Sequence, residues 1–169
     1  MPEIVIRDIA DFSHWVPTIS AWFYAEWREF YVDQTEADVR QRVASWLERD
    51  RIPTALVAVA DGEVVGTVAL KEREFEHLAA SPWLAGLYVV PHFRKCGIGA
   101  KLLHAAENKA RALGMQKLYL YTPRGQRFYG TYGWTPQQEL SIGWGMVTVM
   151  EKSLWSSNIF QPQPLKRRG

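Results

Sequence analysis

The segment that most constrains the fold is a strand, a glycine-bearing turn and a helix in immediate succession. It reads LYVVPHFRKCGIGAKLL over residues 87–103, and Arg94, Gly97 and Gly99 form an R-x-x-G-x-G pattern. The two glycines provide positions without a Cβ atom, where the backbone can approach a ligand closely or adopt positive φ. The amides that open the helix lack intrahelical partners and lie at the positive end of its dipole. The segment therefore predicts a strand-to-helix unit whose turn binds an anion such as a pyrophosphate.

Glycines also occur in tight turns that bind nothing, so the spacing must decide which phosphate loops remain possible. A nucleoside triphosphate loop requires G-x-x-x-x-G-K-[ST], but Gly97, Gly99 and Lys101 lie too close together, and Leu102 stands where the hydroxyl residue should be. A dinucleotide fingerprint requires a third glycine at position 102 and an acidic residue near position 120, and the sequence has neither. Nucleoside triphosphatases and Rossmann dinucleotide enzymes are therefore not indicated.

The composition favours one domain with a small-molecule partner. A chain of 169 residues suits a single hydrophobic core, which we expect over residues 1–155, followed by a loosely held tail over residues 156–169. The 20 basic and 18 acidic side chains leave a net charge of only +2, so neither a nucleic-acid partner nor a polybasic membrane patch is indicated. Apolar runs such as residues 54–60 are far shorter than the roughly 20 residues of a membrane helix.

The cysteine and histidine content bears on location and metal binding. Cys96 is the only cysteine, which rules out an intramolecular disulfide. Because the first twelve residues carry acidic side chains where a secretory signal is basic and then apolar, we expect a cytoplasmic protein. The four histidines lack metal-ligand spacing, so no metal is expected. A thiol at a helix N-terminus can be reactive, but we interpret Cys96 as a small residue that fills the turn.

The first half of the chain predicts a strand, two helices and a hairpin. Residues 3–8 alternate as a strand, and an aromatic amphipathic helix follows from about 13 to 30. Thr35 opens a second helix, with Asp38 placed for a capping box. The β-rich runs 54–60 and 64–70 are joined by Asp61-Gly62, the dipeptide that favours a type I′ hairpin turn.

The second half predicts a cleft within an α/β layout. A charged loop over residues 71–82 precedes a strand at 83–90, where Gly86 indicates a bulge that splays this strand from its neighbour. The elements expected after it are a helix at 98–113 capped by Gly114, a strand at 117–122, a turn at 123–125, a short helix at 126–132 and a hairpin of 139–142 with 146–151. The strand–turn–helix–strand unit over 83–122 is then the parallel centre of a mixed sheet.

Two separated stretches resemble motifs of the GNAT superfamily of acyl-CoA-dependent N-acetyltransferases. LYVVPHFRKCGIGAKLL is similar to that family's acyl-CoA pyrophosphate motif, and FYGTYGW at residues 128–134 is similar to its F-Y-x-x-x-G-F motif after the next strand. The element order agrees over most of residues 3–152. The resemblance implies an α/β fold with a mixed, mostly antiparallel central sheet, a parallel splayed strand pair and flanking helices.

The resemblance also implies an acetyl-CoA site between the strands at 83–90 and 117–122. Backbone near Leu87 and Val89 would hold the pantetheine arm and polarise the thioester carbonyl, while helix-opening amides hold the pyrophosphate. Tyr129 would be the acid that reprotonates the departing CoA thiolate, although a packing role also explains a tyrosine there. The residues assigned to acetyl-CoA are Leu87, Val89, Arg94, Lys95, Cys96, Gly97, Ile98, Gly99, Ala100 and Thr122. Thr122 or Gln126 would replace an asparagine that many relatives carry at the end of this strand.

The acceptor amine and the base that deprotonates it are not defined by the sequence. Glu72, Glu74, Glu76 and His77 lie in the loop before the cleft strand, where a solvated charged loop is the simpler description of most of them. Aromatic residues of the first helices would shape an apolar or cation-accepting pocket, or pack in the core: Trp22, Phe23, Trp27 and Tyr31.

The resemblance leads us to expect an N-acetyltransferase that moves the acetyl group of acetyl-CoA directly to a small amine, with a homodimer also possible. One alternative is a catalytically silent acyl-CoA-binding sensor or accessory protein of the same fold. Another is a partner-binding module in which the KRRG tail docks on an acidic surface.

Overall fold

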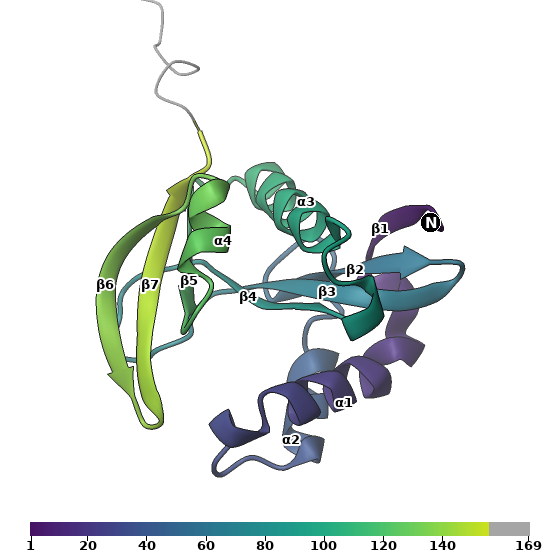
Figure 1. Ribbon diagram of the computed structural model, residues 1–169, viewed down its shortest axis with the longest axis horizontal. Helices are drawn as coiled ribbons and strands as arrows, with labels where there is room; N and C mark the ends of the chain where they lie inside the picture. The colour runs from purple at the N-terminus through teal and green to yellow at the C-terminus, as the bar shows by residue number, and fades with distance from the viewer. Residues whose placement is uncertain (156–169) are drawn as a thin grey trace, which may run out of the picture.

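A seven-stranded sheet with the order β1-β2-β3-β4-β5-β7-β6 forms the centre of the computed structural model, which describes residues 1–155 (Figure 1). The strands are β1 (Ile4–Asp8), β2 (Thr54–Ala60), β3 (Glu63–Lys71), β4 (Trp83–Val89), β5 (Lys117–Thr122), β6 (Thr135–Ile142) and β7 (Gly145–Ser153). The helices are α1 (Val16–Glu26), α2 (Glu36–Ala44), α3 (Ile98–Ala112) and α4 (Gln126–Thr131), with 3₁₀ turns at Ile9–Trp15, Arg28–Phe30 and Pro91–Phe93. This element order is the one that the sequence predicts.

The sheet is antiparallel at every junction except β4 with β5, which run parallel. That parallel pair is joined in register only at Trp83 and Tyr119, so the strands separate beyond this point. Figure 1 shows the consequence, with β1–β4 in one half of the molecule and β5–β7 in the other. The mixed, mostly antiparallel sheet with a splayed parallel pair is therefore confirmed.

Two apolar layers cover opposite faces of the first half of the sheet. In β2, Leu56 and Ala58 face the layer under α3, while Ala55 and Val57 face the layer formed by α1 and α2. Figure 1 places α3 and these two helices on opposite sides of β1–β4. The alternation explains why β2 reads as a continuous apolar run, since a strand buried on both faces has no polar side.

Two local predictions are confirmed in detail. Asp61 and Gly62 have φ of 50° and 79°, the paired positive angles that a type I′ hairpin turn requires. At the start of α2, the Thr35 hydroxyl accepts from the Asp38 amide at 3.2 Å, and the Asp38 carboxylate accepts from the Thr35 amide at 2.8 Å. This capping box fixes the first turn of α2.

Two predicted boundaries are wrong. The helix expected over 13–30 begins as a 3₁₀ turn at Ile9 and ends at Glu26, because Trp27 leaves helical geometry with φ of −113° and ψ of 24°. The C-terminal hairpin is longer than expected, since β6 starts at Thr135 and tolerates Pro136 as a sheet edge. The expectation of a loosely held tail over 156–169 falls outside the described residues.

No helix within residues 1–155 combines the length and apolar character needed to cross a membrane.

Candidate functional site

The splay between β4 and β5 begins at a bulge centred on Gly86. Ala85 pairs with Ala69 and Tyr88 with Thr67, so Gly86 and Leu87 together lie opposite Val68. Gly86 has φ of 61°, and a Cβ atom there would lie 3.3 Å from the Phe23 ring, which leaves little room for a side chain. The bulge predicted from the sequence is therefore present, and beyond it β4 pairs with β3 alone.

A cavity of about 520 Å³ lies beside the glycine-bearing turn at residues 94–99, and we call it the loop cavity. Its lining includes β4 at Leu87 and Val89, the turn residues Arg94, Lys95 and Gly97, the helix opening Ile98, Gly99 and Ala100, and the rings of Phe93, Phe128 and Tyr132. The structure thus gathers at one cavity nearly all of the positions that the sequence assigned to acetyl-CoA. Cys96 lies in the same turn, exposed, with its thiol near the Arg94 carbonyl at 3.5 Å.

The backbone of this turn is shaped to present its amides. Lys95 and Gly97 have φ of 62° and 80°, and Gly97 is the N-cap residue of α3. The Lys101 amide bonds the Gly97 carbonyl at 3.1 Å, so the amides of Ile98, Gly99 and Ala100 precede the first intrahelical bond. A Cβ atom at Gly97 would meet nothing within 4 Å, and one at Gly99 only the Phe128 ring at 3.6 Å. An anion can therefore reach these amides directly.

Arg94 ties the turn to its surroundings. Its Nε donates to the Val89 carbonyl at 2.8 Å, its guanidinium lies 5.4 Å from the centre of the Tyr88 ring, and Nη2 is 3.6 Å from a Glu26 carboxylate oxygen. The side chain is 44% exposed, which leaves part of the guanidinium facing solvent. A phosphate contact by Arg94 stays a prediction.

Tyr129 lies on α4, which follows β5 and borders the gap between β4 and β5 from the β5 side. Burial raises the pKa of its phenol to about 12. Within residues 1–155 its hydroxyl makes no hydrogen bond, so its proton is available to a ligand. The neighbouring Thr122 hydroxyl accepts from the Gly125 amide at 2.8 Å, and Gln126 donates to Thr148 at 2.8 Å. These two side chains order the turn into α4, and a cofactor contact by Thr122 stays a prediction.

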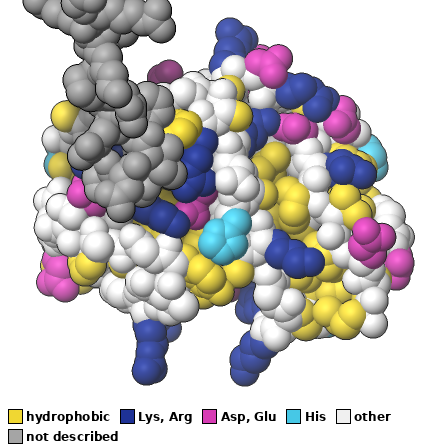
Figure 2. Space-filling view, turned by 90° about the horizontal axis from the view of Figure 1, so that it is seen from above, with side chains coloured by type: hydrophobic (Ala, Val, Ile, Leu, Met, Phe, Trp, Pro, Cys, Tyr) yellow, Lys and Arg dark blue, Asp and Glu magenta, His cyan; other side chains and the backbone are white. Residues whose placement is uncertain are grey.

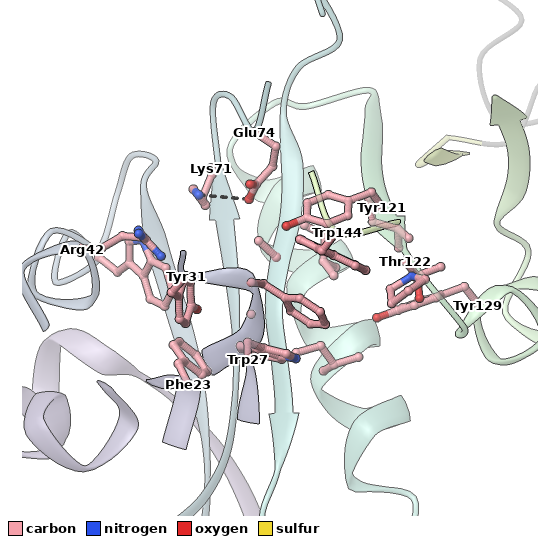
Figure 3. Close-up of a pocket in the computed structure, with 18 residues that line it drawn as sticks. Phe23, Trp27, Tyr31, Arg42, Lys71, Glu74, Tyr121, Thr122, Tyr129 and Trp144 are labelled. Carbon is pink, nitrogen blue, oxygen red and sulfur yellow. Dashed lines mark ion pairs between the residues drawn. The ribbon is translucent and has the colours of Figure 1, made fainter. Parts of the chain in front are cut away.

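A second cavity, of about 320 Å³, adjoins the first across β4, and we call it the aromatic cavity. Leu87 borders both cavities, and Tyr129 borders this one. Figure 3 shows Phe23, Tyr31 and Arg42 on one side and Tyr121, Thr122 and Tyr129 on the other. The Phe30 and Trp144 rings stack at 3.8 Å between centroids, which joins the turn after α1 to the β6–β7 turn.

Among the described residues, one acidic and two positively charged side chains line the aromatic cavity. Lys71 and Glu74 form an ion pair at 3.0 Å, with side chains 22% and 12% exposed. Arg42 lies 5.4 Å from the centre of the Tyr31 ring, on the same side of the cavity as Lys71 in Figure 3. The loop over 71–82 holds four candidates for the base that deprotonates the acceptor amine. Glu74 lines the cavity, while Glu72, Glu76 and His77 are exposed.

The tyrosines around this cavity remain protonated. Burial raises the pKa of Tyr121 far above its ordinary value, and the Glu74 carboxylate adds to that shift. Burial also raises the pKa of Tyr31, against the opposing effect of the Arg42 guanidinium. Both phenols are therefore neutral hydrogen-bonding groups at physiological pH.

The sequence predicts part of the wall of the aromatic cavity but not the rest. Phe23, Trp27 and Tyr31 line the cavity, whereas Trp22 stacks on Tyr88 in the packed layer. The missed residues come from separate segments: Phe30, Arg42, Lys71, Tyr121 and Trp144. Trp144 carried one usable signal, because a tryptophan between two glycines in a hairpin turn has no core to fill.

The molecular surface agrees with the low net charge. Figure 2 shows Lys and Arg side chains spread over one face among acidic and apolar ones, without a single large basic patch. Within the part of the chain that the structure describes, no group of three or more His, Cys, Asp or Glu side chains is placed to hold a metal ion. The two adjoining cavities are therefore the candidate functional site.

Comparison with known proteins gives a consistent result. A sequence model of the acetyltransferase (GNAT) family matches residues 18–134. The aminoglycoside N(6')-acetyltransferase type 1 of Klebsiella aerogenes is 36% identical over 92 residues, which cover 51% of this chain and 60% of that protein. The match therefore spans less than two thirds of that relative.

Solved structures share the fold at low sequence identity. A crystal structure of an aminoglycoside 6'-N-acetyltransferase complexed with coenzyme A has a TM-score of 0.73 and 19% identity, covering 90% of this chain and 98% of the other. The aminoglycoside 6'-N-acetyltransferase from Enterococcus faecium has a TM-score of 0.71 and 19% identity, with the same coverage.

Proposed function

This chain belongs to the acetyltransferase (GNAT) family, and we propose that it transfers the acetyl group of acetyl-CoA directly to the amine of a small molecule. The amine nitrogen attacks the thioester carbonyl carbon, a C–N bond forms as the C–S bond breaks, and the thiolate leaves with a proton from the protein. Both substrates are bound at once, so much of the catalysis is positioning.

The observation that carries this proposal is the gap between β4 and β5, with a cavity at each end. The strands pair only at Trp83 and Tyr119, so backbone groups of β4 near Leu87 and Val89 have no β5 partner. A thioester arm that lies in the gap can pair with this backbone as a further strand would. The loop cavity then takes the phosphates and the aromatic cavity takes the amine.

The loop cavity fits a pyrophosphate. Positive φ at Lys95 and Gly97 turns the backbone, and the amides from Cys96 to Ala100 lie at the N-terminus of a 15-residue helix. Gly97 and Gly99 keep this surface free of side-chain atoms. Backbone donors and the helix dipole thereby stabilise the phosphate charge, and Arg94 and Lys95 on the cavity wall can add charge-assisted contacts.

Tyr129 donates the proton that the leaving thiolate requires. Its pKa of about 12 keeps the phenol protonated across the physiological range, and its hydroxyl faces the cavity next to the gap. A neutral donor aimed at a developing sulfur anion stabilises that charge as it forms.

Glu74 receives the proton that the amine must lose. An amine of pKa about 10 is protonated at neutral pH and cannot attack until it is neutral. Glu74 is the one carboxylate on the aromatic cavity wall within residues 1–155, and Lys71 holds it at 3.0 Å. Its negative charge attracts the ammonium form and accepts the proton, directly or through water.

An amino sugar is one candidate acceptor. The relative from Klebsiella aerogenes is named as an aminoglycoside acetyltransferase, and its 36% identity over 92 residues favours a related substrate. A small amine of another kind fits the same chemistry, and the charged side chains of the aromatic cavity bear on which kind of amine it accepts. A catalytically silent acyl-CoA sensor would share the loop cavity but would not need Tyr129.

Acetyl-CoA calorimetry with a matched variant pair tests the proposal. We expect micromolar binding by the wild type and loss of binding in Gly99→Glu, because a carboxylate beside the helix-opening amides repels the phosphates. Gly143→Glu is the control, since that glycine lies in the β6–β7 turn, has open space around it and lines neither cavity. Thermal melts establish that both variants fold.

A folded wild type that does not bind acetyl-CoA would contradict the proposal. Binding without thiol release over a broad amine panel, together with an unchanged Tyr129→Phe variant, would instead favour the silent sensor.

A further inference from the structure

The charge balance of the aromatic cavity restricts the acceptor. Arg42, Lys71 and Glu74 are the charged side chains on its wall among residues 1–155. Lys71 and Glu74 neutralise each other at 3.0 Å, so the excess charge of the wall is the Arg42 guanidinium. A ligand that balances the cavity therefore carries one negative group toward Arg42.

Arg42 has no carboxylate partner of its own in the described chain. Its guanidinium donates to the amide oxygen of Gln34, which is neutral, and lies over the Tyr31 ring. Asp38 is one turn away on α2, but its carboxylate accepts from the Thr35 amide and hydroxyl in the capping box. Asp38 nevertheless lies within electrostatic reach of Arg42, and the Tyr31 hydroxyl accepts from its guanidinium. No carboxylate of residues 1–155 forms an ion pair with this half-buried group, so some of its five donors remain for a ligand.

The remaining wall is largely aromatic. Trp27, Phe30, Tyr31 and Trp144 line the cavity, and the stacked Phe30 and Trp144 rings present a flat apolar surface. Such walls favour a ligand body with a flat or apolar face.

Resting on the proposed function, we infer that the acceptor is a carboxylate-bearing amine with an aromatic or apolar body, whose carboxylate pairs with Arg42. The amine end lies toward Glu74 and the β4–β5 gap, and the carboxylate end lies toward α2. Arg42 then holds the carboxylate on the α2 side of the cavity, which directs the amine toward the gap. A polycation suits this wall poorly, since its additional ammonium groups meet Arg42 and Lys71, and Glu74 is the sole acid on the wall among residues 1–155.

The test compares two ligands that differ in one charge. 4-(Aminomethyl)benzoate and 4-(aminomethyl)benzamide share a ring and a primary amine, and only the first carries a carboxylate. We expect kcat/KM with acetyl-CoA to be about tenfold or more higher for the benzoate, mostly through KM, since a charge-assisted bidentate pair contributes that much. Spermidine and kanamycin serve as polycationic comparisons and should be poorer than the benzoate.

Arg42→Gln removes the charge and should bring the benzoate-to-benzamide ratio near one, because kcat/KM for the benzoate falls far more than kcat/KM for the benzamide. Arg40→Gln is the control, because Arg40 is exposed on the same helix and lines neither cavity. A ratio near one in the wild type, a ratio that survives in Arg42→Gln, or a preference for spermidine or kanamycin would overturn the inference.

Direct binding separates this inference from the proposed function. Calorimetry of both benzoate and benzamide on CoA-saturated protein reports the Arg42 contact even where turnover is slow. Tighter benzoate binding that Arg42→Gln abolishes supports the inference, and equal or absent binding of the two overturns it. Failure of the protein to bind acetyl-CoA is the distinct result that contradicts the proposed function, and the benzoate comparison without CoA still decides the Arg42 contact.

Discussion

The loop cavity and the aromatic cavity are built on different principles. The first is shaped by the backbone of one continuous stretch, residues 87–100, with additional rings from α4. The second is made of side chains from five separate stretches, at residues 23–31, 42–46, 71–87, 120–129 and 144. A site built from backbone tolerates side-chain changes better than a site built from side chains, so the two cavities should respond differently to mutation.

Both cavities share one wall, because α4 borders each of them. Phe128 and Tyr132 line the loop cavity, and Tyr129 lines the aromatic cavity. The helix is held by Lys152 on β7, which donates to the Tyr132 carbonyl at 2.7 Å and forms an ion pair with Glu107 on α3. Glu107 is 1% exposed, so this pair lies inside the framework that keeps the two cavities in register.

The largest expected effect comes from breaking that framework. Within residues 1–155, Lys152→Met leaves the buried Glu107 carboxylate with only a distant His104 contact at 3.7 Å. We expect a loss of about 3–5 kcal/mol in the free energy of unfolding, measured by urea denaturation, because an unpaired buried charge is costly. The double variant Glu107→Leu/Lys152→Met should recover much of the loss. A double variant less stable than Lys152→Met would show that the unpaired charge is not the cause.

A smaller effect separates chemistry from binding in the shared wall. Tyr129→Phe should lower kcat about 100-fold while acetyl-CoA binding by calorimetry stays unchanged, because the ring remains and only the proton donor is lost. With the pKa of the phenol at about 12, the wild-type rate should rise as the amine deprotonates and should not decline below about pH 11 through Tyr129. An alkaline decline near pH 9 that Tyr129→Phe removes would contradict this assignment.

The side-chain cavity should lose acceptor affinity when one ring is removed. Trp144→Ala eliminates the stack on Phe30, and we expect the amine KM to rise roughly tenfold with no change in acetyl-CoA affinity. Met146→Ala is the control, since Met146 is 54% exposed on the same hairpin and does not line the cavity. Equal effects of the two substitutions would assign the loss to the hairpin rather than to the cavity.

The smallest effect is expected in the backbone cavity. Cys96→Ser changes an exposed side chain in the pyrophosphate turn but keeps its amide, so acetyl-CoA affinity should stay within about twofold of wild type. Calorimetry under reducing conditions measures it. A large loss would mean that the thiol itself contacts the ligand, and the contrast between the two cavities would then be weaker than the structure indicates.

Local chemistry made much of the fold predictable. Thr35 and Asp38 form their capping box between residues three apart, and Asp61-Gly62 forms its turn from the conformational preferences of two adjacent residues. The same holds for the Gly86 bulge and for the glycines of the turn before α3. Each depends on backbone geometry within a few residues, which the sequence states directly.

The path of the chain after α1 could not be predicted from local patterns. The aromatic pattern over residues 13–30 predicts one helix, but the chain leaves helical geometry at Trp27, and the short turn that follows carries Phe30 against Trp144. No local rule connects residues so far apart in the chain. The contact exists because the fold places the β6–β7 turn beside the short turn that follows α1.

The sequence by itself determined the glycine-bearing turn before α3, the element order and the family, because each is a property of a contiguous segment or of the order of segments. Tertiary structure alone decided that Glu74, and not its exposed neighbours, faces the cavity, that Arg42 faces it without an ion-paired carboxylate among the described residues, and that burial raises the pKa of Tyr129 to about 12. Burial and charge proximity arise from packing between distant segments, so they appear only once the chain has folded.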